Sequence, residues 1–117
     1  MDREKILIHG ICFLTILIIG MACNFSVMIH NDGKMPATLQ YPYTDEHHIS
    51  FMNPNVTIQY PYLADTISIG DYLCSPGDIF ATIGIVGYVV LMLIYLRLQI
   101  VDYIAKKRRP KRRHLRH

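Results

Sequence analysis

IFATIGIVGYVVLMLIYL, residues Ile79 to Leu96, is the stretch that decides the fold, because it contains no Asp, Glu, Lys or Arg. A second uncharged apolar block, ILIHGICFLTILIIGMACNFSVM, runs from Ile6 to Met28. As helices the two blocks would be ~27 and ~34 Å long, close to the ~30 Å hydrocarbon core of a bilayer. One charge near the centre of a span costs about 2.5–3.5 kcal/mol, so the lack of charges favours insertion. The sequence predicts an all-α membrane protein, a helical hairpin of two transmembrane helices joined by an irregular loop.

The charges outside these blocks are distributed unevenly along the chain. Between His30 and Asp78, six acidic residues and one lysine give a net charge of −5, whereas from Arg97 to His117 nine basic residues and one acid give +8. Because positively charged loops stay on the cytoplasmic side, we expect a multi-pass cell-membrane protein with both termini in the cytoplasm. The expected segments are a cytoplasmic N-terminus (1–5), spans at 6–28 and 76–96, an acidic extracytoplasmic loop rich in Tyr and Pro (29–75), and a cytoplasmic helix extension with a basic tail (97–117).

The basic tail is the strongest candidate for a contact with other molecules in the cytoplasm. Its bases are Lys106, Lys107, Arg108, Arg109, Lys111, Arg112, Arg113 and Arg116. Each is worth about 1 kcal/mol against an anionic lipid surface, and a span holds the tail beside that surface. Nucleic acid is the alternative, since basic clusters also neutralise phosphates. The tail has no interleaved aromatic residues for stacking on bases, so we favour the anionic lipid headgroups of the cytoplasmic face.

An alternative for the first block is a signal peptide that is cleaved off. It is longer than the apolar region of a secretory signal, which has about 7–15 residues. A lipoprotein site would need a branched aliphatic residue at the position of Gly20, three residues before Cys23. We therefore expect the block to stay as an anchor.

Cys23 and Cys74 both fall near the outer face of the membrane. We favour two free thiols there, and a disulfide between them is the alternative.

The loop repeats the tetrapeptide Gln-Tyr-Pro-Tyr, which suggests a contact surface. The tyrosines of the two copies are Tyr41, Tyr43, Tyr60 and Tyr62. Tyrosine favours the headgroup layer, with its ring towards the apolar side and its hydroxyl towards water. We expect this surface to lie on the outer leaflet or on a neighbouring protein; the alternative is an unstructured loop in which the repeat is coincidence. The alternation from Val56 to Tyr60 predicts a short strand.

Ser75-Pro76-Gly77-Asp78 has the pattern of a helix start. Ser75 would be the N-cap, Pro76 occupies the first helical position, and Asp78 completes a capping box. The similar Ser68-Ile69-Gly70-Asp71 predicts the start of a short interfacial helix. We prefer the interpretation of these aspartates as caps over a cation site.

Small residues recur on one face of the second block, where helices in lipid can approach closely. Gly77, Ala81 and Gly84 follow one another at i, i+4 and i+7 on this face of the second helix, and Gly87 lies close by. Gly20 and Asn24 share a face of the first block, and an Asn within a span needs a polar partner. We expect these two faces to contact each other or another subunit.

No pattern in the sequence indicates catalysis or a cofactor. His47 and His48 beside Asp45 and Glu46 resemble metal ligands, but zinc-type spacing is lacking, so we expect solvated loop residues and no metal. Neither block holds a carboxylate, and we expect His9, one turn inside the first block, to reach the cytoplasmic interface, so a proton or ion carrier is disfavoured. We expect no enzymatic activity and no bound cofactor.

Three stretches of the chain resemble a family of small bacterial integral membrane proteins of unknown function. They are Asn31-Asp32-Gly33-Lys34-Met35-Pro36, Leu63-Ala64-Asp65 and Ser75-Pro76-Gly77-Asp78-Ile79. In that family Asn-Gly-Gly-(Lys/Arg)-Met-Pro follows a span, and Ser-(Ile/Pro)-Gly-Asp-Ile opens the final apolar helix. The likeness covers residues 20–95; Asp32 replaces a Gly, extra N-terminal spans are lacking and the basic tail is long. The resemblance implies the membrane topology and a bacterial source, and no chemistry.

These observations favour a non-enzymatic accessory or structural subunit of a larger membrane protein complex, or a homo-oligomer, because two helices by themselves bury little surface. One alternative is a pore former like a phage holin, for which two spans and a basic tail are typical. Another is an accessory to a transporter whose tyrosine-rich loop binds a small molecule.

Overall fold

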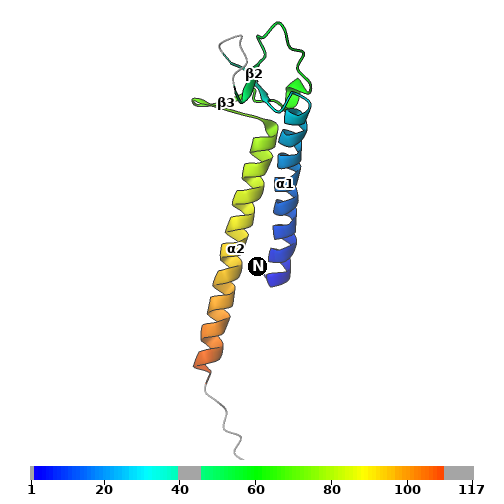
Figure 1. Cartoon of the computed structure of the whole chain (residues 1–117). Coiled ribbons are helices and arrows are strands. Elements are labelled where there is room, and N and C mark those ends of the chain that lie inside the picture. The colour runs from blue at the N-terminus through cyan, green and yellow to red at the C-terminus, as the bar shows by residue number, and fades with distance from the viewer. Residues whose placement is uncertain (1, 40–45, 110–117) are drawn as a thin grey trace, which may run out of the picture.

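The computed structural model describes residues 2–39 and 46–109, in which the two apolar blocks form long helices that lie side by side (Figure 1). The helices are α1 (Arg3–Ile29) and α2 (Pro76–Arg108). A small strand-containing region joins them at one end, and we call its described residues (30–39 and 46–75) the head. Its elements are β1 (Met35–Ala37), β2 (His48–Ser50), the short 3-10 helix η1 (Pro61–Leu63), β3 (Ile67–Ile69) and β4 (Tyr72–Cys74).

The ends of α1 follow from local sequence. At its start the Asp2 carboxylate accepts a hydrogen bond from the Lys5 backbone N–H at 2.9 Å, which satisfies one of the free donors of the first turn. After its last turn the chain reverses through Asp32 (φ 57°) and Gly33 (φ 76°), residue types that tolerate left-handed backbone. The Gly33 N–H donates to the Met28 carbonyl at 2.8 Å and closes the helix end.

The ends of α2 also follow from local sequence. The Ser75 hydroxyl accepts from the Asp78 N–H at 3.2 Å, and the Asp78 carboxylate accepts from the Ser75 N–H at 3.0 Å, so both halves of a capping box are present. The helix ends at Arg108 because residues before a proline, here Pro110, disfavour helical backbone, and Arg109 is extended (φ −66°, ψ 122°).

The two helices touch through their glycines. A Cβ atom on Gly20 would lie 2.5 Å from the Gly77 carbonyl oxygen, and one on Gly84 would lie 2.5 Å from the Leu17 backbone nitrogen. Real Cβ atoms do not approach other atoms so closely, so the backbones meet where side chains are missing. Nearer the far end the contact loosens, because a Cβ on Gly10 would meet Met92 at an ordinary 3.5 Å.

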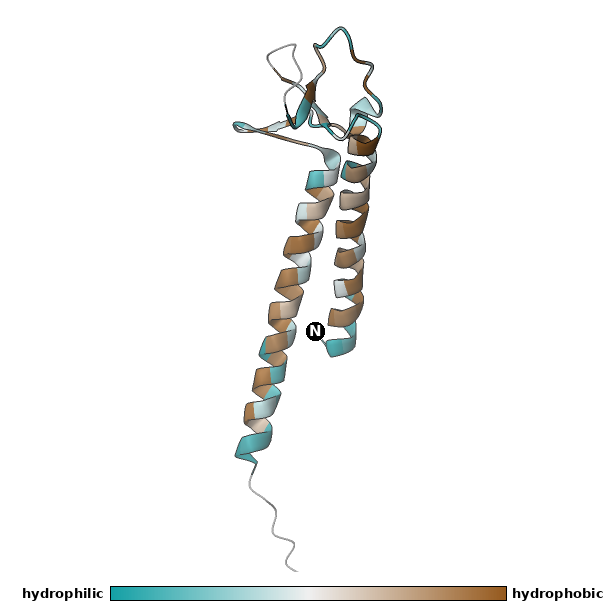
Figure 2. Ribbon diagram, in the orientation of Figure 1, coloured by the Kyte–Doolittle hydropathy of each residue, from teal (hydrophilic) through white to brown (hydrophobic). Residues whose placement is uncertain are grey.

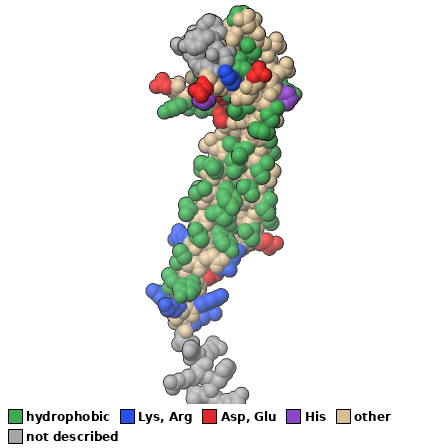
Figure 3. Space-filling view, in the orientation of Figure 1, with side chains coloured by type: hydrophobic (Ala, Val, Ile, Leu, Met, Phe, Trp, Pro, Cys, Tyr) green, Lys and Arg blue, Asp and Glu red, His purple; other side chains and the backbone are tan. Residues whose placement is uncertain are grey.

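Most of the apolar surface of both helices stays exposed after they pack together. Of the most apolar 18 residues, 17% are buried in α1 and 11% in α2. Apolar residues surround both helices (Figure 2), and hydrophobic side chains cover the visible face of the pair (Figure 3). Both helices are long enough and apolar enough to cross a membrane, which confirms the prediction of two such helices.

The head has a small core around a pair of parallel strands. β1 pairs with β2, with Met35 opposite His48 and Ala37 opposite Ser50. Ala37 also forms a bridge with Asp65 on its other side. The buried residues of this core include Met35, Ala37, Ile49, Ser50 and Ala64.

The second sheet is a hairpin. β3 and β4 are antiparallel, and Ile69 pairs with Tyr72 across a two-residue turn. Gly70 takes a positive φ of 58° in that turn, which suits glycine at the first turn position of a type II′ hairpin. The hairpin extends sideways from the start of α2 (Figure 1).

Three expectations about the loop were wrong. The loop is not irregular, since it holds two small sheets. Residues 68–71 start no helix: Ser68 and Ile69 lie in β3, and a positive φ at Gly70 reverses the chain before β4. Residues 56–60 form no strand. Their backbone is instead held at Gln59 by the Asn31 side chain, and Tyr60 adopts a left-handed φ of 53°.

Candidate functional site

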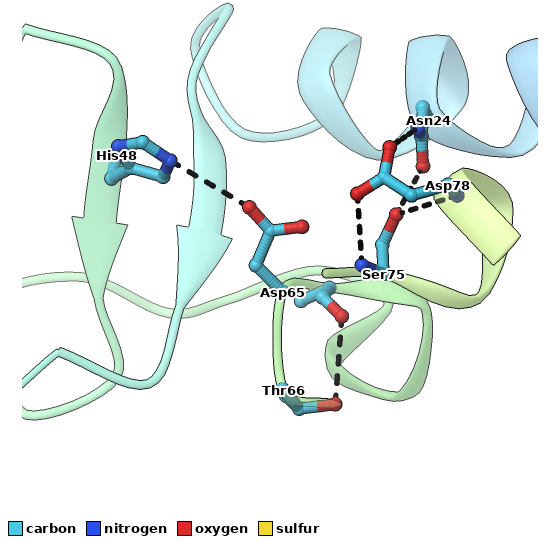
Figure 4. A network of polar contacts seen from close by, with 7 residues as sticks. Asn24, His48, Asp65, Thr66, Ser75 and Asp78 are labelled. Carbon is cyan, nitrogen blue, oxygen red and sulfur yellow. Dashed lines mark hydrogen bonds and ion pairs between the residues drawn. The ribbon is translucent and has the colours of Figure 1, made fainter. Parts of the chain in front are cut away.

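A polar cluster joins the helices where they meet the head (Figure 4). Asn24, on α1, donates from Nδ2 to the Asp78 carboxylate at 2.7 Å and accepts at Oδ1 from the Ser75 hydroxyl at 2.6 Å. Ser75 is fully buried. A single amide therefore closes the capping box of α2 from the neighbouring helix. We call Asn24, Ser75 and Asp78 the junction cluster.

Asp65 lies beside the junction cluster, held there by its backbone. Its N–H donates to the Pro36 carbonyl at 2.9 Å, and its carbonyl accepts from the Thr38 N–H at 3.1 Å. The side chain is directed away from these bonds, and one carboxylate oxygen is 3.6 Å from Nε2 of His48. The other oxygen, Oδ1, is buried without a hydrogen bond from any described residue and points towards Ser75 and Asp78 (Figure 4).

This environment favours the neutral form of Asp65. Burial raises the pKa of the Asp65 carboxyl, and the nearby negative charge of Asp78 raises it further. His48 lowers that pKa, but less than the other causes raise it. Asp65 is thus a carboxyl group of raised pKa near the negative charge of Asp78, next to the contact between the helices.

The stability of the head should therefore depend on pH through Asp65. Because the folded-state pKa of this acid is raised, its favourable contribution is full below the ordinary pKa of 3.8 and is lost as the pH rises through the raised value. Asp65→Asn keeps a neutral donor, so we expect the variant to lose this decline. Thermal unfolding in detergent between about pH 4 and pH 8 measures both proteins. An equally steep decline in the variant would contradict the assignment to Asp65.

A second polar connection fixes the loop to the end of α1. The Asn31 side chain donates to the Val27 carbonyl at 2.7 Å and to the Gln59 carbonyl at 3.0 Å. Its Oδ1 accepts from the Gln59 N–H at 3.0 Å. Asn31 is buried, and its amide pairs with both the backbone N–H and the backbone carbonyl of Gln59, as a neighbouring strand would.

The contacts of the junction cluster are hydrogen bonds between protein groups. The Ser75 hydroxyl donates to Asn24, an amide that cannot act as a base, so the arrangement does not activate a nucleophile. Among residues 2–39 and 46–109, no three His, Cys, Asp or Glu side chains are placed to hold a metal ion together.

The remaining residues singled out in the sequence lie in separate places. Gly20, Gly77, Ala81, Gly84 and Gly87 lie in the contact between the helices, where Gly87 faces the Phe13 ring. Cys23 and Cys74 are free thiols. Tyr60 and Tyr62 are exposed, and their rings meet edge to face at 6.3 Å. Tyr41 and Tyr43 fall outside the described residues.

The described bases that follow the second apolar block lie at the opposite end of the molecule from the head. Lys106, Lys107, Arg108 and Arg109 are exposed at the end of α2, and the Lys107 ammonium is 6.0 Å from the centre of the Tyr103 ring. One turn earlier, Asp102 forms an ion pair with Arg3 of α1. Lys111, Arg112, Arg113 and Arg116 lie outside the described residues.

Sequence reasoning missed the contributions of Asn31, His48 and Asp65. No local spacing connects them, because their partners are distant in the chain. A signal was nevertheless present, because the three stretches that carry the family resemblance contain residues of both polar connections: Asp65, Ser75 and Asp78 at the junction, and Asn31 at the end of α1.

The fold and the site define a class of small proteins in which two apolar helices carry a strand-containing head on a shared polar junction. Residues 8–90 match the profile of a family described as a family of unknown function (DUF5317), and the chain belongs to this family. No curated protein and no solved structure matches the chain.

Proposed function

We propose that this chain is a two-span integral membrane protein of the cell membrane and a non-enzymatic accessory or structural subunit of a larger membrane complex. The observation that carries the proposal is the apolar surface that remains exposed around both helices. An apolar side chain left in water forgoes about 1.5–3 kcal/mol of burial energy. An exposed surface of this extent indicates contact with lipid or protein along both helices.

The charges support one orientation of the spans. The loop segment carries −5 and the tail +8, by the counts given above. In the described part of the molecule, most Lys and Arg side chains lie at the far end of the helix pair from the head (Figure 3). We therefore propose that the head is extracytoplasmic, that both termini are cytoplasmic, and that the basic tail contacts anionic headgroups.

This orientation predicts which engineered cysteines can be labelled in intact cells. In a chain whose native cysteines are replaced by serine, Asn55→Cys in the exposed part of the head should react with a membrane-impermeant maleimide. Lys107→Cys at the end of α2 should react only after the cells are permeabilised. The reverse pattern would contradict the orientation while leaving two spans in place.

The role of an accessory subunit is supported by how the chain uses its polar groups and its surface. The junction cluster satisfies its own hydrogen bonds between the helices and the head, which is a structural use. Along α1, a shallow apolar groove of about 550 Å³ remains uncovered. It is lined by Ile18, Met21, Ala22, Asn24, Phe25 and Met28. A membrane helix of a larger subunit has the apolar chemistry that fits there.

Purification in mild detergent tests this role. We expect larger membrane proteins to co-purify with the tagged wild-type chain, and Ala22→Trp, which fills the groove, to reduce their yield. Ile11→Trp is the matched control, because Ile11 is exposed on α1 outside the groove. A clean monomer or homodimer in several detergents would contradict a larger complex, and depolarisation of cells on expression would favour a pore former instead.

A further inference from the structure

The β3–β4 hairpin carries exposed apolar side chains at the level where α2 begins. The last residue of β4 is Cys74, and α2 starts at Pro76, so the hairpin leaves the helix pair at its head end (Figure 1). Ile69 is 58% exposed and Tyr72 is 80% exposed. The described part of the head therefore leaves this pair uncovered.

The register of the hairpin gathers these side chains on one face. Residues paired directly across antiparallel strands share a face, while the next pair along lies on the other. Ile69 pairs with Tyr72 and Ile67 pairs with Cys74, so all four share one face. The pair formed by Ser68 and Leu73 occupies the opposite face.

The face that bears Ile69 is directed towards the apolar side of α2. Ile69 and Cys74 line a groove of about 300 Å³ together with Ile79 and Ile83 of the first turns of α2. Asp78 and Thr82 also border it. The groove is open, and its α2 wall continues into the apolar surface that we assign to lipid.

We propose that the hairpin lies on the membrane surface on the head side, with the Ile67–Ile69–Tyr72–Cys74 face towards the lipid. This inference rests on the proposed spans. The aliphatic side chains enter the boundary of the acyl chains, the Tyr72 ring lies at headgroup depth with its hydroxyl towards water, and acyl carbons fill the groove beneath.

A protein partner fits this face less well than lipid because the face is small. Even a large aromatic side chain buries only about 150–250 Å², so Ile69 and Tyr72 together can bury roughly a few hundred Å² against a partner. A stable protein interface buries about 800 Å² on each partner. A lipid surface needs no such area, since the two helices already hold the chain in place.

Tryptophan fluorescence tests the inference directly, because the chain contains no Trp. Tyr72→Trp introduces a single tryptophan, which can be excited apart from the tyrosines, at an exposed position where no packed neighbour is disturbed. The full-length variant is reconstituted into phosphatidylcholine vesicles, with and without bromine on the acyl chains. We expect a blue-shifted emission and a loss of intensity in the brominated vesicles.

Two control variants separate the outcomes. Ser68→Trp places the probe on the opposite face of the same hairpin and should emit as a water-exposed tryptophan that bromine does not quench. Phe80→Trp lies in α2, ~7 Å below Ser75 along the helix, and should be quenched if α2 spans the bilayer. Quenching at Phe80→Trp without quenching at Tyr72→Trp would overturn the inference about the hairpin and leave the spans intact. No quenching at Phe80→Trp would overturn the spans themselves, and equal quenching on both hairpin faces would overturn the assigned face.

Discussion

Replacing Gly84 with alanine should separate the two helices. The added Cβ would lie 2.5 Å from the Leu17 nitrogen and 2.7 Å from the Phe13 carbonyl oxygen, both of which belong to backbone that cannot rotate away. Overpacking of a tight contact costs about 1–3 kcal/mol, and here relief requires moving a whole helix. We expect a lower unfolding temperature in detergent and a loss of disulfide cross-linking between cysteines introduced on facing turns of α1 and α2.

Gly10→Ala is the matched control for this prediction. It makes the same chemical change within α1, but its Cβ would meet only the flexible end of Met92 at 3.5 Å. Because alanine also has the higher helix propensity, the control should unfold at the wild-type temperature or slightly above it. Equal effects of the two substitutions would show that close backbone contact at Gly84 does not hold the pair together.

Asn24→Asp should open the junction cluster in a pH-dependent way. The substitution keeps the shape of the side chain but removes the donor that lies 2.7 Å from the Asp78 carboxylate. Leaving a part-buried carboxylate without its donor lowers the free energy of unfolding by about 1–3 kcal/mol. Repulsion between two adjacent carboxylates lowers it further. Acidification protonates one carboxyl and restores a donor, so the loss of stability should shrink at low pH.

Asn55→Asp controls for the added charge. Asn55 is exposed in the head, and its backbone N–H donates to the Asn53 side chain at 3.0 Å, a bond that the substitution leaves in place. We expect the control to unfold like the wild type across the pH range. A deficit of Asn24→Asp that stays the same at every pH would indicate a packing defect and would contradict the role of the paired carboxylates.

The sequence could predict the parts of this fold that depend on neighbouring residues. Two uncharged apolar blocks specify two long helices, and a serine three positions before an aspartate specifies a cap, because each signal acts within one or two turns. The same local pattern misled at Ser68 to Asp71, where the glycine adopts a positive φ and makes a hairpin. A pattern shared by caps and turns cannot distinguish the two by itself.

The polar site could not be predicted in the same way. Asp65 meets Asp78, and Asn31 meets Gln59, only because the chain between each pair has folded back. No periodicity records such contacts. Asn24 is an intermediate case: an amide inside an apolar block requires a partner, but its sequence position does not identify Ser75 and Asp78 as that partner.

The junction cluster also has a consequence for the order of events during synthesis. Asn24 emerges from the ribosome about fifty residues before Ser75 and Asp78, so at a synthesis rate of about 5–20 residues per second it waits several seconds for its partners. Until then its amide is unpaired, and the head lacks the contacts that Ser75 and Asp78 make with the first helix, although Asn31 can already hold Gln59. We expect limited proteolysis of chains truncated after Tyr72 to digest the head and of full-length chains to spare it. Completion of the head would then mark the arrival of the second helix.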